Sequence, residues 1–468
     1  MEKSEAAVLA DLALRHYERQ EFTAAEETLD RLVTHAPRHV DLGTYRLLAK
    51  LKTAGGSPDS ARLVMHAALQ ANPGRTEFVA AYADTLAPKE ALATLERHWR
   101  EVRADPSQAA YLMLRMTTIR APLARRAKGL PAEYALSWRE AFQWPDAAAL
   151  PALKETLLAE ISMGSKRATA RLDLTYIAVS EGDWETAERY LEDLRGGPKR
   201  TPADFTAFGA AFHAGLDAMS DQEITGGLVP MRRLLEAPEA GTKVFMASDQ
   251  SYFKGFTLAF LHQLEAAQIP LAVHVHLMDG AETEWEEIRD RLGALKCVQA
   301  TLTAEASGAT TQGRTYARNY FHAVRYVRFF EELRRAGAPL WMLDCDVQLL
   351  RDPRQLFASL GSYDLALRAN PCSFEPMLKI TASCVGVAPT GKGLEFARRV
   401  AASIIHWKDR GTWNWGVDQI SLFSAYAHMS AQGREPNTLF LDHLAMNDKV
   451  GDTGAIRFMS GLDKFAAR

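Results

Sequence analysis

The chain has 468 residues, which is long enough for two or three domains of ordinary size, each with its own core. Its hydrophobic share of 47% and charged share of 24% are typical of globular proteins, and a net charge of −3 argues against a general affinity for nucleic acids or anionic membranes. The first residues show no signal pattern, and no apolar run approaches a membrane span. The cysteines show no paired spacing and predict reduced thiols in a cytoplasmic protein. They are Cys297, Cys345, Cys372 and Cys384.

Residues 1–235 are rich in alanine and predict an all-helical domain. Apolar and small residues recur at the same helical offsets in two successive segments, each closed by a proline: Leu9, Leu12, Ala13, Phe22, Ala25, Leu29, Leu32 and Pro37, followed by Tyr45, Leu48, Ala49, Ala61, Leu69 and Pro73. A looser copy ends at Pro106, and a further one spans Arg171–Leu194. The pattern resembles the tetratricopeptide repeat, a helical hairpin of about 34 residues. A plain helical bundle with a chance spacing is the alternative.

From residue 241 onward, strand patterns alternate with helix patterns. The first expected strand, Lys243–Ala247, ends at Ser248-Asp249, and a later one is the apolar run Pro339–Leu343. Such alternation predicts an α/β domain over residues 241–468 with a largely parallel sheet, whose ligands bind beyond the carboxyl ends of the strands. Neither a G-x-G-x-x-G nor a G-x-x-x-x-G-K-[ST] motif follows the first strand, which argues against dinucleotide binding and P-loop chemistry.

Two aspartates, Asp344 and Asp346, directly follow the apolar run. Alternation along an extended segment places both carboxylates on the same side. Carboxylate oxygens at the edge of a cleft suit Mg²⁺ or Mn²⁺ holding a diphosphate. Aspartate pairs are also common on protein surfaces, so the neighbouring segments decide between a metal site and a solvated turn.

The helix expected before the acidic strand carries a row of basic side chains. Arg314, Arg318, His322 and Arg325 are spaced four, four and three residues apart and therefore share one side of the helix. Guanidinium groups near the acidic pair suit phosphate oxygens. For any one of these residues, a solvated helix face is the alternative.

Several segments resemble the GT-A-fold glycosyltransferases, especially the retaining nucleotide-diphospho-sugar transferases related to glycogenin and the bacterial lipooligosaccharide galactosyltransferases. Pro339–Pro353 (PLWMLDCDVQLLRDP) resembles their D-x-D signature, and Tyr320–Tyr326, which contains Arg325, resembles the helix before it. Ala382–Thr390 is similar to their small-residue strand, and Trp413–Leu422 (WNWGVDQISL) to their Asp-Gln motif. The resemblance covers nearly half of the chain. It implies a Rossmann-like mixed sheet and a metal-dependent enzyme that transfers a hexosyl group with retention.

The resemblance also implies a role for each matching residue. Asp344 and Asp346 are implied as ligands of Mn²⁺ or Mg²⁺, and Asp418 and Gln419 as catalytic residues under the anomeric carbon. The implied contacts to the nucleotide sugar come from Ser248, Asp249, Tyr252, Arg325, Asp344 and Lys464. From the residues alone, Asp418-Gln419 is also explained as a helix N-terminal pair, because aspartate favours that position.

The sequence departs from the family pattern near its end. The family has a histidine three residues before a glycine as a third metal ligand, but Phe458 stands three residues before Gly461. His443 lies upstream and could replace this ligand, but it is more typical of a structural histidine after a strand. We therefore expect two carboxylates, the diphosphate and water to coordinate the metal. His274 and His276 alternate along a strand and are expected in the core or at an edge rather than as ligands.

Trp413 and Trp415 flank Asn414 and fit either packing or stacking on a sugar ring. Helical repeats offer a concave surface, so we expect transfer from a nucleotide-diphosphate sugar to a protein acceptor, such as a bacterial surface or filament protein. Two alternatives remain open. The first is a nucleotidyltransferase on the same kind of sheet, which needs a glycine-rich loop after the first strand, whereas Ser248–Lys254 contains no glycine. The second is a non-catalytic scaffold, in which the repeats are joined to a decayed transferase domain.

Overall fold

A computed structural model describes residues 3–127, 135–136, 142–163, 168–196, 201–236, 242–442 and 455–458. The chain forms two compact units. The first contains Met1–Lys128 and Asp146–Lys166, and the second contains Gly129–Pro145 and Arg167–Arg468. The boundary expected between residues 235 and 241 therefore falls inside the second unit.

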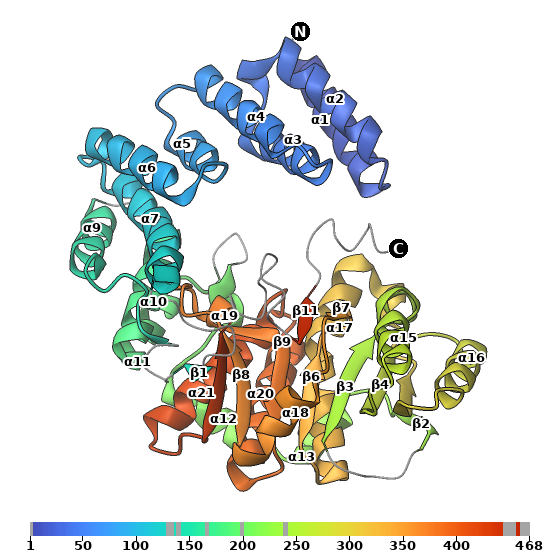
Figure 1. The fold of residues 1–468 in the computed structure, drawn as a ribbon. Helices are drawn as coiled ribbons and strands as arrows, with labels where there is room; N and C mark the ends of the chain where they lie inside the picture. The colour runs from blue at the N-terminus through green and yellow to red at the C-terminus, as the bar shows by residue number, and fades with distance from the viewer. Residues whose placement is uncertain are drawn as a thin grey trace. The chain divides into compact units, whose positions relative to one another are not determined.

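The first unit consists of helices, which short turns connect over residues 3–127 (Figure 1). They are α1 (Lys3–Glu18), α2 (Phe22–His35), α3 (Leu42–Ala54), α4 (Pro58–Ala71), α5 (Thr76–Ala83), α6 (Pro88–Val102), α7 (Pro106–Ala127) and α9 (Leu150–Ser162). Helix α1 packs on α2, α3 on α4, and α6 on α7. The hairpins that the sequence predicts are therefore present.

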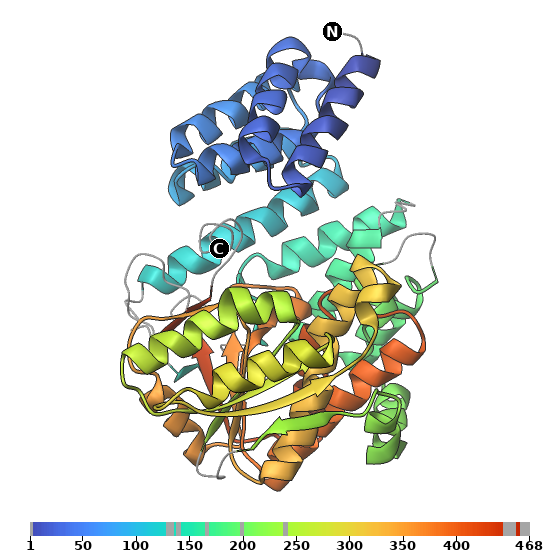
Figure 2. The ribbon, with the colours of Figure 1, turned by 90° about the vertical axis from the view of Figure 1, so that its right-hand side faces the viewer.

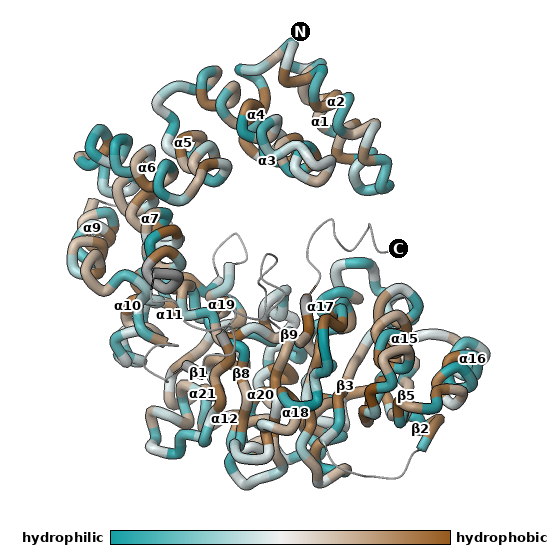
Figure 3. The backbone as a smooth tube through the Cα atoms, in the orientation of Figure 1, coloured by the Kyte–Doolittle hydropathy of each residue, from teal (hydrophilic) through white to brown (hydrophobic). Residues whose placement is uncertain are grey.

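Small and branched apolar side chains close these hairpins. Ala13, Ala25, Leu29 and Leu48 are buried together, and hydrophobic and hydrophilic residues alternate along α1 to α4 in Figure 3. Such alternation produces one apolar stripe per helix, which the neighbouring helix covers. The turn between α3 and α4 contains Gly56 with φ 81°, a conformation that glycine adopts without strain.

The hairpin predicted at Arg171–Leu194 also forms, but it belongs to the second unit. Its helices are α10 (Ala168–Glu181) and α11 (Trp184–Glu192), and Asp183 caps α11 by accepting a hydrogen bond from the backbone N–H of Thr186. The buried side chains of Ala187 and Leu191 share one hydrophobic core with the helices that cover the sheet. This long-range packing, which a local helical pattern does not reveal, moves the boundary toward the N-terminus.

The second unit is built on a mixed sheet with strand order β1-β10-β8-β9-β6-β3-β4-β5-β2. Strands β6, β3, β4 and β5 are parallel neighbours, whereas β9 runs antiparallel to both β6 and β8. The bounds are β1 (Ala135–Leu136), β2 (Arg232–Leu235), β3 (Lys243–Ser248), β4 (Ala272–Met278), β5 (Gln299–Glu305), β6 (Leu340–Leu343), β8 (Leu365–Ala369), β9 (Ile380–Val387) and β10 (Thr438–Asp442). A separate ribbon pairs β7 (Val347–Leu349) with β11 (Ile456–Phe458). The α/β unit with a mixed sheet confirms this coarse part of the prediction.

Helices cover both faces of the sheet (Figures 1 and 2). The helices of the second unit from α12 onward are α12 (Ala210–Ala218), α13 (Asp221–Gly226), α14 (Gln250–Tyr252), α15 (Leu258–Ala266), α16 (Glu282–Gly293), α17 (Arg314–Ala336), α18 (Arg354–Ala358), α19 (Pro376–Lys379), α20 (Gly391–Asp409) and α21 (Val417–Ala431). Phe245 and Met342 face the core formed with α17, α20 and α21, whereas Val244 and Trp341 face the core formed with α15 and α16. This division follows from the alternation of side chains along a strand.

His274 and His276 lie in the core of this unit. His274 Nδ1 is 2.8 Å from Thr301 Oγ1, and His276 Nδ1 is 2.9 Å from Thr303 Oγ1. Both histidines therefore have hydroxyl partners on the neighbouring strand. Within the described ranges, no helix combines the length and the apolarity that crossing a membrane requires.

Candidate active site

The segments that follow β3 and β6 meet at one edge of the sheet. The two strands are parallel and pair Met246 with Leu343, so that the next residues of each strand run on side by side. Cys345 Sγ donates to the carbonyl oxygen of Ala247 at 2.9 Å, and the backbone N–H of Asp344 donates to the carbonyl oxygen of Ser383 in β9 at 3.0 Å. The acidic pair therefore lies where parallel strands end, the usual position of ligands in such sheets.

Arg325 connects this acidic segment to a distant part of the chain. It comes from α17 and is 6% exposed. Its Nη1 forms an ion pair with Asp344 Oδ1, and its Nη2 lies 3.1 Å from Asp418 Oδ2 and 3.4 Å from the carbonyl oxygen of Ala382. Four separate segments thus converge on one guanidinium group: the basic helix, the acidic pair, the small-residue strand and the Asp-Gln segment.

Arg325 and Cys345 keep the same charge state throughout the physiological pH range. Burial acts to lower the pKa of Arg325, but Asp344 and Asp418 outweigh it and raise that pKa above its ordinary value. Burial, reinforced by the two flanking aspartates, raises the pKa of Cys345 to about 12. The thiol between the two carboxylates is therefore protonated and unreactive.

Asp418 lies in the first turn of α21, as the alternative interpretation of the Asp-Gln pair expects. Its Oδ1 accepts a hydrogen bond of 2.8 Å from the backbone N–H of Gln419, while its Oδ2 faces Arg325. Asp418 is 4% exposed. Gly416 precedes the helix with φ 92°, and a Cβ added there would stand 2.7 Å from Met377 Cε. The entry to α21 therefore requires glycine in order to deliver Asp418 to the site.

The two tryptophans of this segment differ in their surroundings. Trp413 is buried and packs edge-on against Tyr316 and Tyr320, with centroid distances of 5.5 and 6.2 Å. Trp415 is 49% exposed. Packing accounts for Trp413, whereas Trp415 presents an aromatic surface to solvent.

The residues expected to hold the nucleotide follow β3. Asp249 caps α14, because its Oδ1 accepts a hydrogen bond of 2.8 Å from the backbone N–H of Tyr252. Ser248 is buried, and its Oγ has no hydrogen-bond partner among the described residues. Tyr252 is partly exposed, and its ring leans on Phe256. Asp249 thus has a structural role as a helix cap, which the sequence did not predict.

The basic row on α17 divides into two parts. Arg314 and Arg318 are exposed near the start of the helix, whereas Arg325 is buried. One further turn along, buried Arg328 pairs with Glu305 at the end of β5, and Tyr320 donates a 2.8 Å hydrogen bond to the same carboxylate. No motif in the sequence marks this second buried ion pair, although Arg328 stands three residues after Arg325 and shares its side of the helix.

The acidic pair supplies two hard oxygen donors, which fit a divalent ion. Asp346 is 6% exposed, and the part of the chain that the structure describes contains no group of three histidine, cysteine or acidic side chains that holds a metal. Mg²⁺ is commonly held by one or two carboxylates together with substrate phosphates, so this donor set is sufficient. Phe458 pairs with Val347 in the ribbon beside Asp346, so that an apolar residue occupies the family's histidine position. His443, Gly461 and Lys464 lie outside the described residues.

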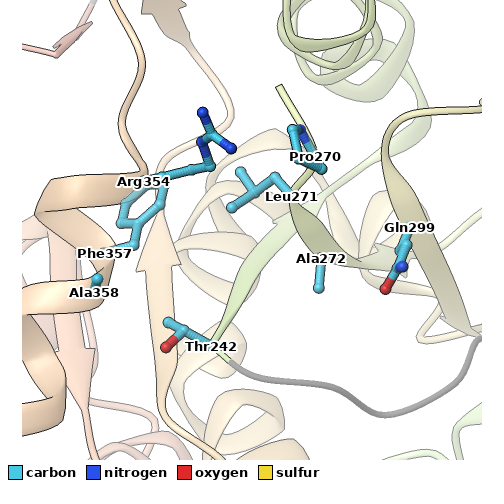
Figure 4. Close-up of a pocket in the computed structure, with 8 residues that line it drawn as sticks. All are labelled: Thr242, Pro270, Leu271, Ala272, Gln299, Arg354, Phe357 and Ala358. Carbon is cyan, nitrogen blue, oxygen red and sulfur yellow. The ribbon is translucent and has the colours of Figure 1, made fainter. Parts of the chain in front are cut away.

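A hollow of about 340 Å³ lies at the other edge of the sheet (Figure 4). Thr242 precedes β3 and Ala272 begins β4, and both line it, together with Leu271, Arg354 and Phe357. Because the acidic pair follows the opposite ends of the strands, this hollow is separate from the candidate site.

The site and fold define an α/β unit with a charged strand-end site, preceded by helical hairpins. No family model and no curated protein matches the sequence. Solved structures that resemble parts of the chain include PilW, a type IV pilus biogenesis factor, with 17% identity over 40% of this chain and 91% of PilW, at a TM-score of 0.22.

Two glycosyltransferases also match. Streptococcus pneumoniae GlyE is 16% identical over 43% of this chain, with a TM-score of 0.28, and a mutant O-GlcNAc transferase of Thermobaculum terrenum is 13% identical over 72%, with a TM-score of 0.24. The match spans 45% of each transferase chain. With TM-scores this low, we infer function from the residues of the site alone.

Proposed function

We propose that the chain is a metal-dependent glycosyltransferase of the GT-A type, which moves a hexosyl group with retention from a nucleotide-diphosphate donor to an acceptor. The observation that carries this proposal is the position of Arg325 between Asp344 and Asp418. It supports the proposal because the acidic pair, the basic helix and the Asp-Gln segment meet at one strand edge. Neither a solvated turn nor an isolated helix cap accounts for this convergence.

Asp344 and Asp346 are the proposed protein ligands of Mn²⁺ or Mg²⁺. When bound, the ion supplies positive charge that stabilises the departing diphosphate. In this scheme Lys464 adds a phosphate contact. Arg325 holds Asp344 in place through a charge-assisted hydrogen bond, which is stronger than one between neutral groups.

Asp418 is the proposed stabiliser of the positive charge that develops at the anomeric carbon. In the transfer, the bond from that carbon to the diphosphate oxygen breaks, and the bond to the acceptor oxygen forms. The diphosphate leaves with the bonding electron pair and takes the acceptor proton. Gln419, the next residue, positions the sugar or the acceptor. Arg325 keeps Asp418 aligned before the substrate arrives.

The nucleotide is assigned to the segment that follows β3. Ser248 supplies a hydroxyl group without a hydrogen-bond partner among the described residues, Tyr252 supplies a partly exposed ring, and Asp249 retains a second carboxylate oxygen beside its capping bond. These groups suit the hydroxyl groups and the base of a nucleoside. Exposed Trp415 is the proposed stacking surface for a sugar ring.

The proposed acceptor is a cytoplasmic polypeptide held by the helical hairpins of the first unit. Arrays of helical hairpins provide extended surfaces for other proteins, which supports this assignment. Removal of residues 1–71, which contain α1 to α4, is expected to abolish modification of a protein acceptor while donor hydrolysis persists. Equal loss of both activities contradicts a recognition role for these hairpins.

A thermal-shift experiment tests the proposed function. We expect one of UDP, GDP, CDP or ADP to raise the melting temperature of the full chain only when Mn²⁺ or Mg²⁺ is present, because a ligand of the native state adds to its stability. Asp346→Asn should remove the metal-dependent part of the shift. No shift with any nucleotide contradicts the proposal and favours the non-catalytic scaffold.

A nucleotidyltransferase is the other enzyme class compatible with an α/β sheet. The turn after β3 passes directly into α14 through the Asp249 cap, without the glycine-rich phosphate loop that this class uses. No feature of the site favours it over sugar transfer.

A further inference from the structure

Helix α1 lies at one end of the helical array in the first unit (Figure 1). One side of it presents two large apolar side chains to solvent: Val8 is 65% exposed and Leu12 is 39% exposed. The two stand four residues apart and are therefore neighbours on the helix surface. The end of a repeat array ordinarily has a polar outer face, because an apolar one attracts another protein. The apolar side of α1 therefore has the character of a contact surface.

The second repeat shows how such a side of a helix is covered. Leu48 on α3 stands 36 residues after Leu12, and 36 residues also separate the prolines that close the two repeats. Leu48 is buried in a cluster with Ala25 and Leu29 of α2, so that the preceding helix covers this side of α3. The equivalent side of α1 has no such cover among the described residues, since Val8 and Leu12 are exposed.

The exposed side of α1 carries a heptad pattern. Its members stand three, four and three residues apart, which is the spacing with which one helix packs along another, and all of them are exposed: Glu5, Val8, Leu12 and Arg15. The order along the helix is acidic, apolar, apolar and basic, and it is symmetrical about Ala10. These four residues form the α1 face.

This symmetry makes the α1 face complementary to itself. When two copies meet antiparallel about a twofold axis, Val8 of one copy meets Leu12 of the other. Glu5 likewise meets Arg15, and each contact occurs twice, because a twofold interface uses the same surface of both copies. A parallel pair would instead place Glu5 on Glu5 and Arg15 on Arg15, and like charges repel. We propose that the α1 face binds a second copy of the chain, so that two antiparallel α1 helices form a dimer.

The charged end of the α1 face suits this contact. Arg15 forms an ion pair with Asp11 on its own helix, and more than half of each side chain is exposed. A guanidinium group has five N–H donors, which is enough for Asp11 and for Glu5 of the second copy. The pair on the helix therefore does not compete with the pair between copies.

Other occupants match the α1 face less well. The first unit has two further exposed apolar side chains at the end of α9, Leu158 and Met163. They stand five residues apart, so they do not form a stripe along one side of a helix as Val8 and Leu12 do. Contact between α1 and that end of another copy would also fail to close and would build open chains.

Sedimentation equilibrium of the full chain, from about 1 to about 100 μM, tests the proposal. The apparent mass should rise from the 51.8 kDa of one chain toward twice that mass and no further, because a short helical interface gives a reversible dimer. Val8→Asp places an unpaired charge against Leu12 of the second copy and should raise the dissociation constant about tenfold or more. Leu63→Asp, a control at an exposed apolar position of α4, should leave it unchanged. Circular dichroism checks that both variants are folded.

Charge reversal tests the antiparallel register. Glu5→Arg and Arg15→Glu each turn two attractive contacts into repulsive ones, so each alone should raise the dissociation constant about fivefold or more at low salt. The variant with both substitutions pairs opposite charges again and should return to within about twofold of the wild type.

Four results overturn the proposal. They are a wild-type chain that stays at the mass of one copy at the highest concentration, masses that grow beyond two copies, a Val8→Asp variant that dimerises like the wild type, and a double charge reversal that does not restore the dimer. The readout is mass in solution, so these results are independent of sugar transfer.

Discussion

Arg325 Nη2 lies 3.1 Å from Asp418 Oδ2, although 93 residues separate the two in the sequence. The same guanidinium group pairs through Nη1 with Asp344 in the acidic segment. A cation shared by two carboxylates fixes the spacing between the proposed metal ligand and the proposed catalytic carboxylate. Such preorganised charges are what a site needs in order to stabilise a transition state without rearranging.

Removal of the Arg325 charge should lower the free energy of unfolding of the chain. Arg325→Met leaves Asp418 buried without its cation, and loss of one partner of a buried pair costs about 3–5 kcal/mol. The free energy of unfolding, measured by urea titration, provides the check. Arg318→Met on the exposed part of the same helix should stay within about 0.5 kcal/mol of the wild type. Equal effects of the two substitutions contradict the buried bridge.

Replacement of the Asp346 carboxylate should remove activity without loss of the fold. Asp346→Asn keeps the shape of the side chain and takes away one of two charged metal donors, so we expect a fall of about 100-fold or more in metal-dependent nucleotide release. The matched control is Asp352→Asn, which breaks an exposed ion pair with Arg354 and should change little. Similar activities in the two variants would show that Asp346 does not hold the ion.

Gly416→Ala should displace Asp418 by two separate effects. The left-handed backbone costs about 1–2 kcal/mol for a residue with a Cβ, and that Cβ meets Met377. In the double variant with Met377→Ala, the contact is relieved but the backbone cost remains. A double-mutant cycle of unfolding free energies should therefore show a loss smaller than the sum of the single losses. Strict additivity contradicts the proposed contact.

The stability of the second unit should fall on acidification partly through His274. Burial, opposed by Glu332, lowers the pKa of His274 from 6.5 to about 4. Between these values the unfolded chain binds more protons, so the contribution is complete above pH 6.5 and is lost as the pH falls toward 4. Its full size is about 3 kcal/mol. His274→Phe should flatten the dependence of unfolding free energy on pH across this window, and an unchanged slope would contradict the assignment.

The strand-end position of the acidic pair follows directly from the sequence. An apolar run followed by Asp344 and Asp346 predicts a buried strand that ends in carboxylates, and β6 is such a strand. The spacing on α17 likewise identified Arg325 as a member of one helix face. The choice of Arg325 over Arg318 came from the family resemblance, because local spacing does not say which part of a helix is buried.

Other features depend on contacts between distant segments and leave no local pattern. The hairpin α10–α11 looks like its predecessors in sequence, yet its buried face packs into the core of the second unit. The stacking of His213 on His428 brings together residues from two helices whose sequences show no shared motif. Patterns predicted the elements here, and tertiary packing decided which of them adjoin.

Mass spectrometry of released nucleotide tests whether the chain is a metal-dependent sugar transferase. The full chain would be incubated with a panel of nucleotide-diphosphate sugars, with Mn²⁺, with Mg²⁺ and with a chelator, beside Asp346→Asn. We expect release of one nucleotide that depends on the metal and is lost in the variant. Release of no nucleotide, or equal release by wild type and variant, contradicts the proposed function.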